Sequence, residues 1–120
     1  MRTKKEFIER LIPYKGCEYI YKEDIGYIAW QVSTGENVEL MFIETKEKQL
    51  GFGKQLIAEM VSRIKPFNSV FVFRLASNED AGKFYRALGF QETLISGLYK
   101  VDAVIGVVNY NTLCQNLLIK

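Results

Sequence analysis

The segment around Gly51 and Gly53 constrains the fold most, because these two glycines join a strand pattern to a helix pattern. Before them, residues 37–44 are apolar on both faces around residues 40–43, which is typical of a strand at the centre of a sheet. After them, apolar side chains recur at helical spacing, with polar ones between. They are Leu56, Ile57, Met60, Val61 and Ile64. This segment therefore predicts a strand, a glycine loop and an amphipathic helix in direct succession.

The rest of the chain contains strand and helix patterns, with no internal repeat, low-complexity tract or linker. We predict helices over 3–12, after the two glycines and over 77–90, and strands over 17–22, 25–33, 37–44, 69–75, 90–95 and 98–110. The tail after residue 111 contains apolar residues without a clear period, so we predict no element there. Strand meanders combined with two crossover helices indicate a mixed sheet of α+β, three-layer (α/β/α) type. We expect one domain over 1–120.

The composition excludes several kinds of chemistry. The chain of 120 residues contains no histidine, so it has neither a catalytic triad with histidine nor a histidine-ligated metal, and we expect no metal. Cys17 and Cys114 stand alone, and we expect reduced, structural thiols of an intracellular protein. No apolar run reaches the length of a membrane span, and the N-terminus lacks a secretion signal. We therefore predict a cytoplasmic protein without a membrane partner.

The glycine loop predicts that backbone amides approach a ligand, most often a phosphate. A glycine costs about 0.5–1 kcal/mol of backbone entropy at such a place, which a function should offset. We expect side chains at positions 51 and 53 to block the ligand, so that Gly53→Val keeps the fold but loses binding. A dinucleotide fingerprint needs glycine in place of Leu56, and a P-loop needs Ser or Thr in place of Gln55. The RNA-recognition strand and the kinase glycine loop do not fit either.

The run from Lys48 to Gly53 resembles the pattern Gln/Arg-x-x-Gly-x-Gly/Ala, with which GNAT N-acetyltransferases hold the diphosphate of acetyl-CoA. A second GNAT motif, Asn-x-x-Ala-x-x-x-Tyr-x-x-x-Gly-Phe, is matched by Asn78, Ala81, Tyr85, Gly89 and Phe90. The two motifs come in the family's order with one strand between them, and the resemblance covers roughly Glu36 to Tyr99. Lys48 departs from the pattern, because it keeps the positive charge but lacks the planar fork of Arg.

The resemblance implies a GNAT-like, mostly antiparallel mixed sheet with a V-shaped splay between its central strands. It also implies an N-terminally shortened fold, since the family usually has a strand and two helices before the first strand predicted here. Acetyl-CoA is the implied co-substrate, with its diphosphate on Lys48, Gln49, Leu50, Gly51, Phe52, Gly53 and Lys54. Its pantetheine arm would pair with the main chain of Met41, Phe42 and Ile43, and an N–H near Met41 would polarise the thioester.

Two residues are expected to carry the acid–base chemistry. Tyr85 matches the family's general acid, which protonates the departing thiolate, although it also falls on the predicted inner face of its helix. Glu39 is the candidate base, because it lies inside an apolar strand, on the predicted same face as Met41 and Ile43. The alternative is a solvated Glu39 with a water that relays the proton. Asn78 is expected to contact acetyl-CoA, to cap its helix, or to do both.

These expectations predict an N-acetyltransferase that moves an acetyl group from acetyl-CoA directly to a primary amine of a small molecule or a protein. A catalytically silent module of the same fold, binding acyl-CoA or a protein, is the alternative. A nucleic-acid-binding domain is a third interpretation, which rests only on aromatic strands and a net charge of +2; we expect no nucleic-acid partner.

The strand aromatics Tyr19, Tyr21, Tyr27 and Trp30 would line the acceptor side or belong to the core. The short N-terminal region and the apolar tail are compatible with a homodimer.

Overall fold

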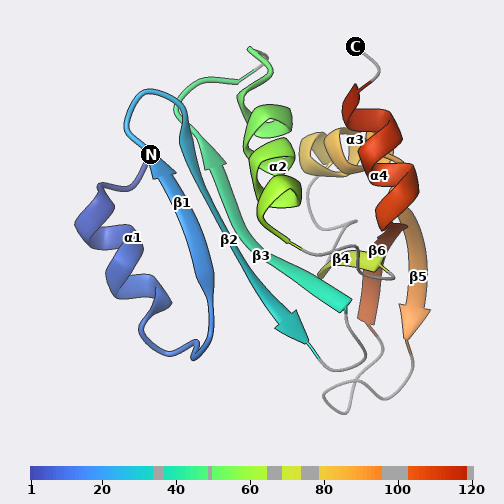
Figure 1. The fold of residues 1–120 in the computed structure, drawn as a ribbon, viewed down its shortest axis with the longest axis horizontal. Helices are drawn as coiled ribbons and strands as arrows, with labels where there is room; N and C mark the ends of the chain where they lie inside the picture. The colour runs from blue at the N-terminus through green and yellow to red at the C-terminus, as the bar shows by residue number, and fades with distance from the viewer. Residues whose placement is uncertain (34–36, 49, 65–68, 74–78, 96–102, 119–120) are drawn as a thin grey trace.

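A computed structural model describes residues 1–33, 37–48, 50–64, 69–73, 79–95 and 103–118 (Figure 1). The helices are α1 (Lys4–Leu11), α2 (Phe52–Arg63), α3 (Glu79–Ala87) and α4 (Tyr110–Leu118). The strands are β1 (Glu18–Lys22), β2 (Gly26–Ser33), β3 (Asn37–Thr45), β4 (Ser69–Phe73), β5 (Gln91–Ile95) and β6 (Ala103–Asn109). They form a six-stranded mixed sheet in the order β1-β2-β3-β4-β6-β5. The predicted α+β fold is confirmed.

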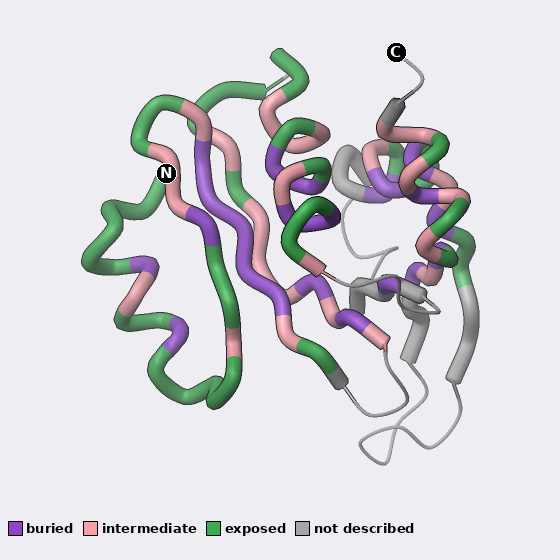
Figure 2. Tube along the Cα trace, viewed as in Figure 1, coloured by how far each residue is buried: buried purple, intermediate pink, exposed green. Residues whose placement is uncertain are grey.

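Helices cover both faces of the sheet, with α1 and α2 on opposite sides of β1–β3 (Figure 1). Strand β2 supplies both interfaces, because its side chains alternate between the two faces. Ile28 and Trp30 belong to a large core cluster with α2, α3 and α4, whereas Tyr27 and Ala29 belong to a smaller cluster with α1. Most of β2 is therefore buried, as Figure 2 shows. Of the apolar stripe predicted for α2, all members are buried except the half-buried Ile64.

Helix α1 starts at a capping box that fixes its first turn. The Thr3 hydroxyl accepts a hydrogen bond from the Glu6 N–H (3.2 Å), and the Glu6 carboxylate accepts one from the Thr3 N–H (3.0 Å). Phe7 then stacks on Tyr27 of β2, with 4.2 Å between the ring centroids. We predicted that this helix would extend through Ile12. Ile12 is instead the C-cap residue and 74% exposed, because the helix ends one residue earlier.

Helix α4 was not predicted from the sequence. The Asn109 Oδ1 accepts a hydrogen bond from the Thr112 N–H (2.8 Å) and so caps the first turn. The residues that pack into the large core cluster recur at i, i+3, i+4 and i+7: Tyr110, Leu113, Cys114 and Leu117. We missed this period because Tyr110 was assigned to the preceding strand, which in fact ends at Asn109. No helix within the described ranges has both the length and the apolar character needed to cross a bilayer.

The sheet opens between β3 and β4. These two parallel strands pair over three residues, ending with Glu39 opposite Phe71. Beyond that point β3 continues to Thr45 beside β2, whereas Val72 and Phe73 of β4 pair with β6. The central strands therefore diverge from Glu39 onward, and the predicted V-shaped splay is confirmed.

Candidate active site

A β-bulge lies directly after the point where β3 and β4 separate. Ala29 of β2 pairs with Phe42, but the next residue, Trp30, pairs with Leu40. Met41 is therefore an extra residue on β3, opposite no residue of β2 and outside the stretch that pairs with β4. Bulges of this kind bend a strand and redirect its side chains.

The bulge changes the face that each β3 side chain takes. Glu39 alternates with buried residues of the α2-side core, so its own side chain faces the α1 side. Phe42 also packs in the α1 cluster, whereas Ile43 packs in the α2-side core. We predicted that Glu39, Met41 and Ile43 would share a face. This was wrong for Ile43, because one extra residue inverts the alternation.

Glu39 lies half-buried at the apex of the splay, opposite Gln31 of β2. Burial raises the pKa of the Glu39 carboxyl above its ordinary value. Cys17, the residue before β1, lies close to this site, since its Sγ is 3.7 Å from the Sδ of Met41. The pKa of the Cys17 thiol is raised, first by burial and then by the charges of Glu18 and Glu39. We call Cys17, Glu39 and Met41 the apex cluster.

The N-terminus of α2 lies at the end of the fold where β3 ends (Figure 1). Gly51 is the N-cap residue, with φ 77° and ψ 8°, a left-handed conformation that glycine adopts without strain. Among the described residues no side chain caps the helix, and its first turn contains no acidic residue. Lys48 and Leu50 are both exposed. The positive end of the helix dipole is thus available to an anion.

Gly53 has a packing role that the sequence did not reveal. A Cβ atom at this position would lie 3.0 Å from two ring carbons of Phe84 in α3, whereas one at Gly51 would meet nothing within 4 Å. The bare Cα of Gly53 therefore allows α3 to approach the start of α2. Our expectation that Gly53→Val would keep the fold intact does not take this contact into account.

Tyr85 is held firmly on the inner face of α3. It is 7% exposed and lies edge-on between Phe84 and Phe90, whose ring centroids are 5.2 and 5.3 Å away. The Phe90 N–H donates to the Tyr85 carbonyl, and the Gly89 N–H donates to that of Arg86, which together end the helix. Burial raises the pKa of the Tyr85 hydroxyl to about 12, so it stays protonated at physiological pH.

Tyr85 and Glu39 lie on opposite faces of the sheet. Tyr85 belongs to the large cluster that includes α2, whereas the Glu39 side chain points to the α1 side. A neutral proton donor and a carboxylate of raised pKa thus lie on the two sides of the sheet. Such an arrangement can accept a proton on one face and deliver one on the other.

The remaining predicted site residues divide into three groups. Gln49 and Asn78 lie outside the described residues. Phe52 and Lys54 are half-buried in the first turn of α2. Of the strand aromatics, Tyr21 and Tyr27 pack in the α1 cluster around Phe7 and Trp30 is buried on the α2 side, whereas Tyr19 contacts the edge of Phe7 but is exposed. Among the described residues, no three Cys, Asp or Glu side chains group together as metal ligands would.

Sequence and structure comparisons define the class of protein. Residues 14–112 match the family described as "Acetyltransferase (GNAT) domain". The chain therefore belongs to the GNAT family of acetyltransferases, and the resemblance carried by the two motifs is confirmed. No curated protein matches the sequence.

Solved structures share the fold at low sequence identity. A putative GNAT acetyltransferase from Desulfovibrio desulfuricans is 18% identical, with a TM-score of 0.67 over 88% of this chain and 78% of its own. A Bacillus subtilis acetyltransferase in complex with CoA is 19% identical, with a TM-score of 0.61 over 88% and 84%. A GNAT acetyltransferase from Elizabethkingia anophelis with acetyl-CoA bound is 18% identical, with a TM-score of 0.63 over 88% and 83%. The second of these proteins is in complex with CoA, and the third has acetyl-CoA bound.

Proposed function

We propose that this protein is an N-acetyltransferase that transfers the acetyl group of acetyl-CoA directly to a primary amine of a small molecule or a protein. The observation that carries the proposal is the register of β3. Its pairing with β4 ends at Glu39, and the bulge at Met41 follows at once. An extended ligand can pair with a strand edge of this kind as an additional strand would.

We assign the diphosphate of acetyl-CoA to the N-terminus of α2. Gly51 is the N-cap and no side chain of the described residues caps this end of the helix. Charge-assisted hydrogen bonds to such amides contribute about 1.5–3 kcal/mol each. The residues assigned to this contact are Lys48, Gln49, Leu50, Gly51, Phe52, Gly53 and Lys54, with Asn78 as a further contact. The pantetheine arm is assigned to the main chain of Met41, Phe42 and Ile43.

We assign the proton transfers to the residues that flank the splay. The amine nitrogen attacks the thioester carbonyl carbon, which the N–H near Met41 polarises. Glu39 takes the proton that the amine loses, directly or through a water. The carbon–sulfur bond breaks, and Tyr85 protonates the departing thiolate. The raised pKa of Tyr85 keeps its hydroxyl protonated until the thiolate leaves, and the raised pKa of Glu39 makes it a stronger base.

The proposal is tested by calorimetry with acetyl-CoA, followed by an assay of thiol release over a panel of amines, peptides and polyamines. We expect binding, and thiol release with at least one acceptor. Failure to bind acetyl-CoA would contradict the proposal. Binding without release from any acceptor would favour the silent module, an alternative that Lys48 supports because the family pattern has Gln or Arg there.

We further infer a cytoplasmic location from the two free cysteines.

A further inference from the structure

We infer that Cys17 determines acceptor specificity. Its side chain lines the route by which the amine reaches the splay from the α1 side. This inference rests on the proposed function, because it assumes that the thioester lies at the bulge. It assigns a role to a residue that the sequence indicated only as a structural thiol.

The first support is the position of Cys17 relative to the bulge. Its Sγ lies 3.7 Å from the Sδ of Met41, the extra residue of β3. Cys17 is half-buried, not enclosed, and ends the connection between α1 and β1. A group that approaches the Met41 sulfur from the α1 side therefore passes close to this thiol.

The second support is the side on which the candidate base lies. Glu39 faces the α1 side, and its charge acts on the Cys17 thiol. An amine that loses its proton to Glu39 must come from this side, whereas Tyr85 protonates the thiolate from the other. Cys17 thus stands on the acceptor's path and not on that of the leaving thiol.

The surroundings of Cys17 suit a side chain that lines the acceptor site and not one that acts as a nucleophile. Burial and two nearby carboxylates, Glu18 and Glu39, raise the pKa of its thiol, so the thiolate needed for covalent catalysis is scarce at pH 7. A neutral thiol beside a thioether offers an apolar, polarisable surface. Such a surface suits the methylene chain of an aliphatic amine and resists wide or anionic groups.

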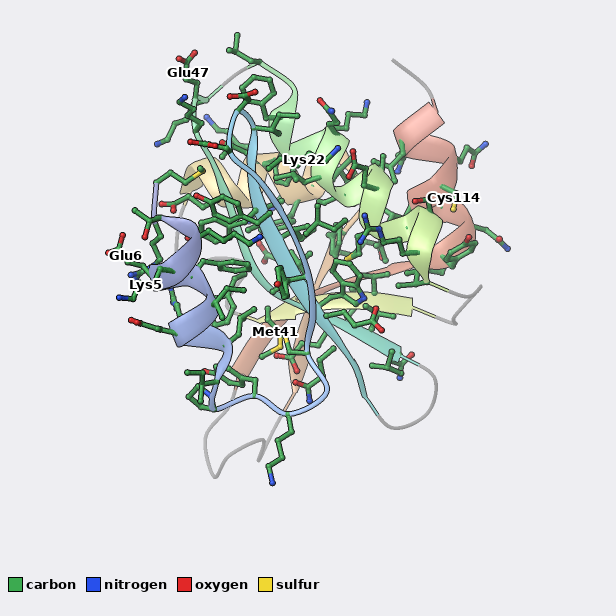
Figure 3. The ribbon with its side chains drawn as sticks, turned by 60° about the vertical axis from the view of Figure 1, so that its left-hand side comes forward. Lys5, Glu6, Lys22, Met41, Glu47 and Cys114 are labelled. Carbon is green, nitrogen blue, oxygen red and sulfur yellow. The ribbon has the colours of Figure 1, made fainter. Side chains whose placement is uncertain are left out.

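Alkylation by iodoacetamide, followed residue by residue with mass spectrometry, tests the inference without knowledge of the acceptor. Acetyl-CoA should slow the modification of Cys17 about tenfold or more, because the acetylated arm would end beside it. 3′-Phosphoadenosine 5′-diphosphate, which lacks the arm, should leave the rate unchanged. Cys114 is the internal control, since it lies on α4, well away from Met41 (Figure 3); its rate should not change with either compound.

The outcomes separate the inference from the proposed function. If calorimetry shows that acetyl-CoA binds but Cys17 reacts at the same rate, the inference is wrong and the proposed function stands. If acetyl-CoA does not bind, the proposed function fails and the inference fails with it. Equal protection by the nucleotide without the arm would also overturn the inference, because it would indicate a general change in structure.

Substitution provides a second readout on an acceptor that the thiol-release assay identifies. Cys17→Met lengthens the side chain and should raise the KM for the acceptor about fivefold or more, with the Kd for acetyl-CoA nearly unchanged. Cys114→Met is the matched control and should leave both constants unchanged. A Cys17→Met protein with the KM of the parent would contradict the inference.

Discussion

At the residue scale, the function proposed here depends on a few side chains whose setting the fold determines. Met41 is the clearest case, because this one extra residue inverts the alternation of β3 and leaves Glu39 and Ile43 on opposite faces. Tyr85 is another, since burial keeps its hydroxyl protonated. Neither effect requires an unusual residue type. Each follows from the register or from the packing around an ordinary side chain.

Tyr85→Phe should lower kcat about 100-fold, because it removes the proton donor and keeps the packed ring. The Kd for acetyl-CoA should change less than about twofold, since the ring remains in place. Steady-state kinetics and calorimetry check these values. Tyr110→Phe, on α4, is the matched control and should keep full activity. A Tyr85→Phe protein with the parent's kcat would show that this hydroxyl is not the acid.

Glu39→Gln should abolish most activity but stabilise the fold at neutral pH. The pKa of Glu39 is raised in the folded state, so its contribution to stability is present at low pH and is lost as pH rises through that pKa. The variant should therefore melt higher by about 1–3 °C at pH 7, with the difference vanishing below about pH 4. Thermal melts over a pH series measure this difference. A lower Tm at pH 7 would contradict the interpretation of Glu39 as a destabilised, functional carboxylate.

At the scale of elements, the contact between α2 and α3 connects the two sequence motifs of the family. Gly53 lies in the first turn of α2, Phe84 precedes Tyr85 in α3, and a Cβ at position 53 would lie 3.0 Å from the Phe84 ring. Packing and ligand approach are thus two separate reasons for the same glycine. A single substitution at this position does not distinguish them, but a pair of substitutions does.

Gly53→Val should lower the free energy of unfolding by about 1–3 kcal/mol, the usual cost of overpacking. In a Phe84→Ala background, where the ring is absent, the added side chain should cost much less. Urea denaturation of the four proteins gives the coupling. If the side chain also obstructs the diphosphate, acetyl-CoA affinity should stay low in the double variant. Recovered affinity would show that Gly53 serves packing alone.

Helix α4 depends on its cap and on one buried stripe. Asn109→Ala removes the acceptor for the Thr112 N–H and should cost about 1 kcal/mol. Asn111→Ala, at an exposed position two residues later, is the control and should change the free energy of unfolding little. Urea denaturation measures both. Equal stability of the two variants would mean that the cap contributes nothing to the fold.

At the scale of the whole molecule, local patterns predicted the layers well and long-range register poorly. The stripe of α2 follows from neighbours in sequence, and it was predicted. The extra residue at Met41 depends on how β2 pairs with β3, and no local pattern contains that information. The approach of Cys17 to Met41 and of Phe84 to Gly53 is missing from the sequence for the same reason, since each contact joins distant segments.

Helix α4 is a different kind of miss. Its period and its Asn109 cap are local signals. They are recognisable when the helical spacing is counted from Tyr110, the first residue after β6. The capping box of Thr3 and Glu6 is likewise local. The error lay in where a strand was thought to end, and strand ends are decided by pairing with β4 and β5.

Hydrogen exchange of the protein with and without saturating acetyl-CoA tests the central claim most directly. We expect slowed exchange of the amides in two segments, residues 40–43 of β3 and residues 51–53 at the start of α2, because the ligand would take up both sets of N–H groups. Helix α1, residues 4–11, should be unaffected. Acetyl-CoA that binds without slowing exchange in either segment would contradict the placement of the co-substrate between the splayed strands.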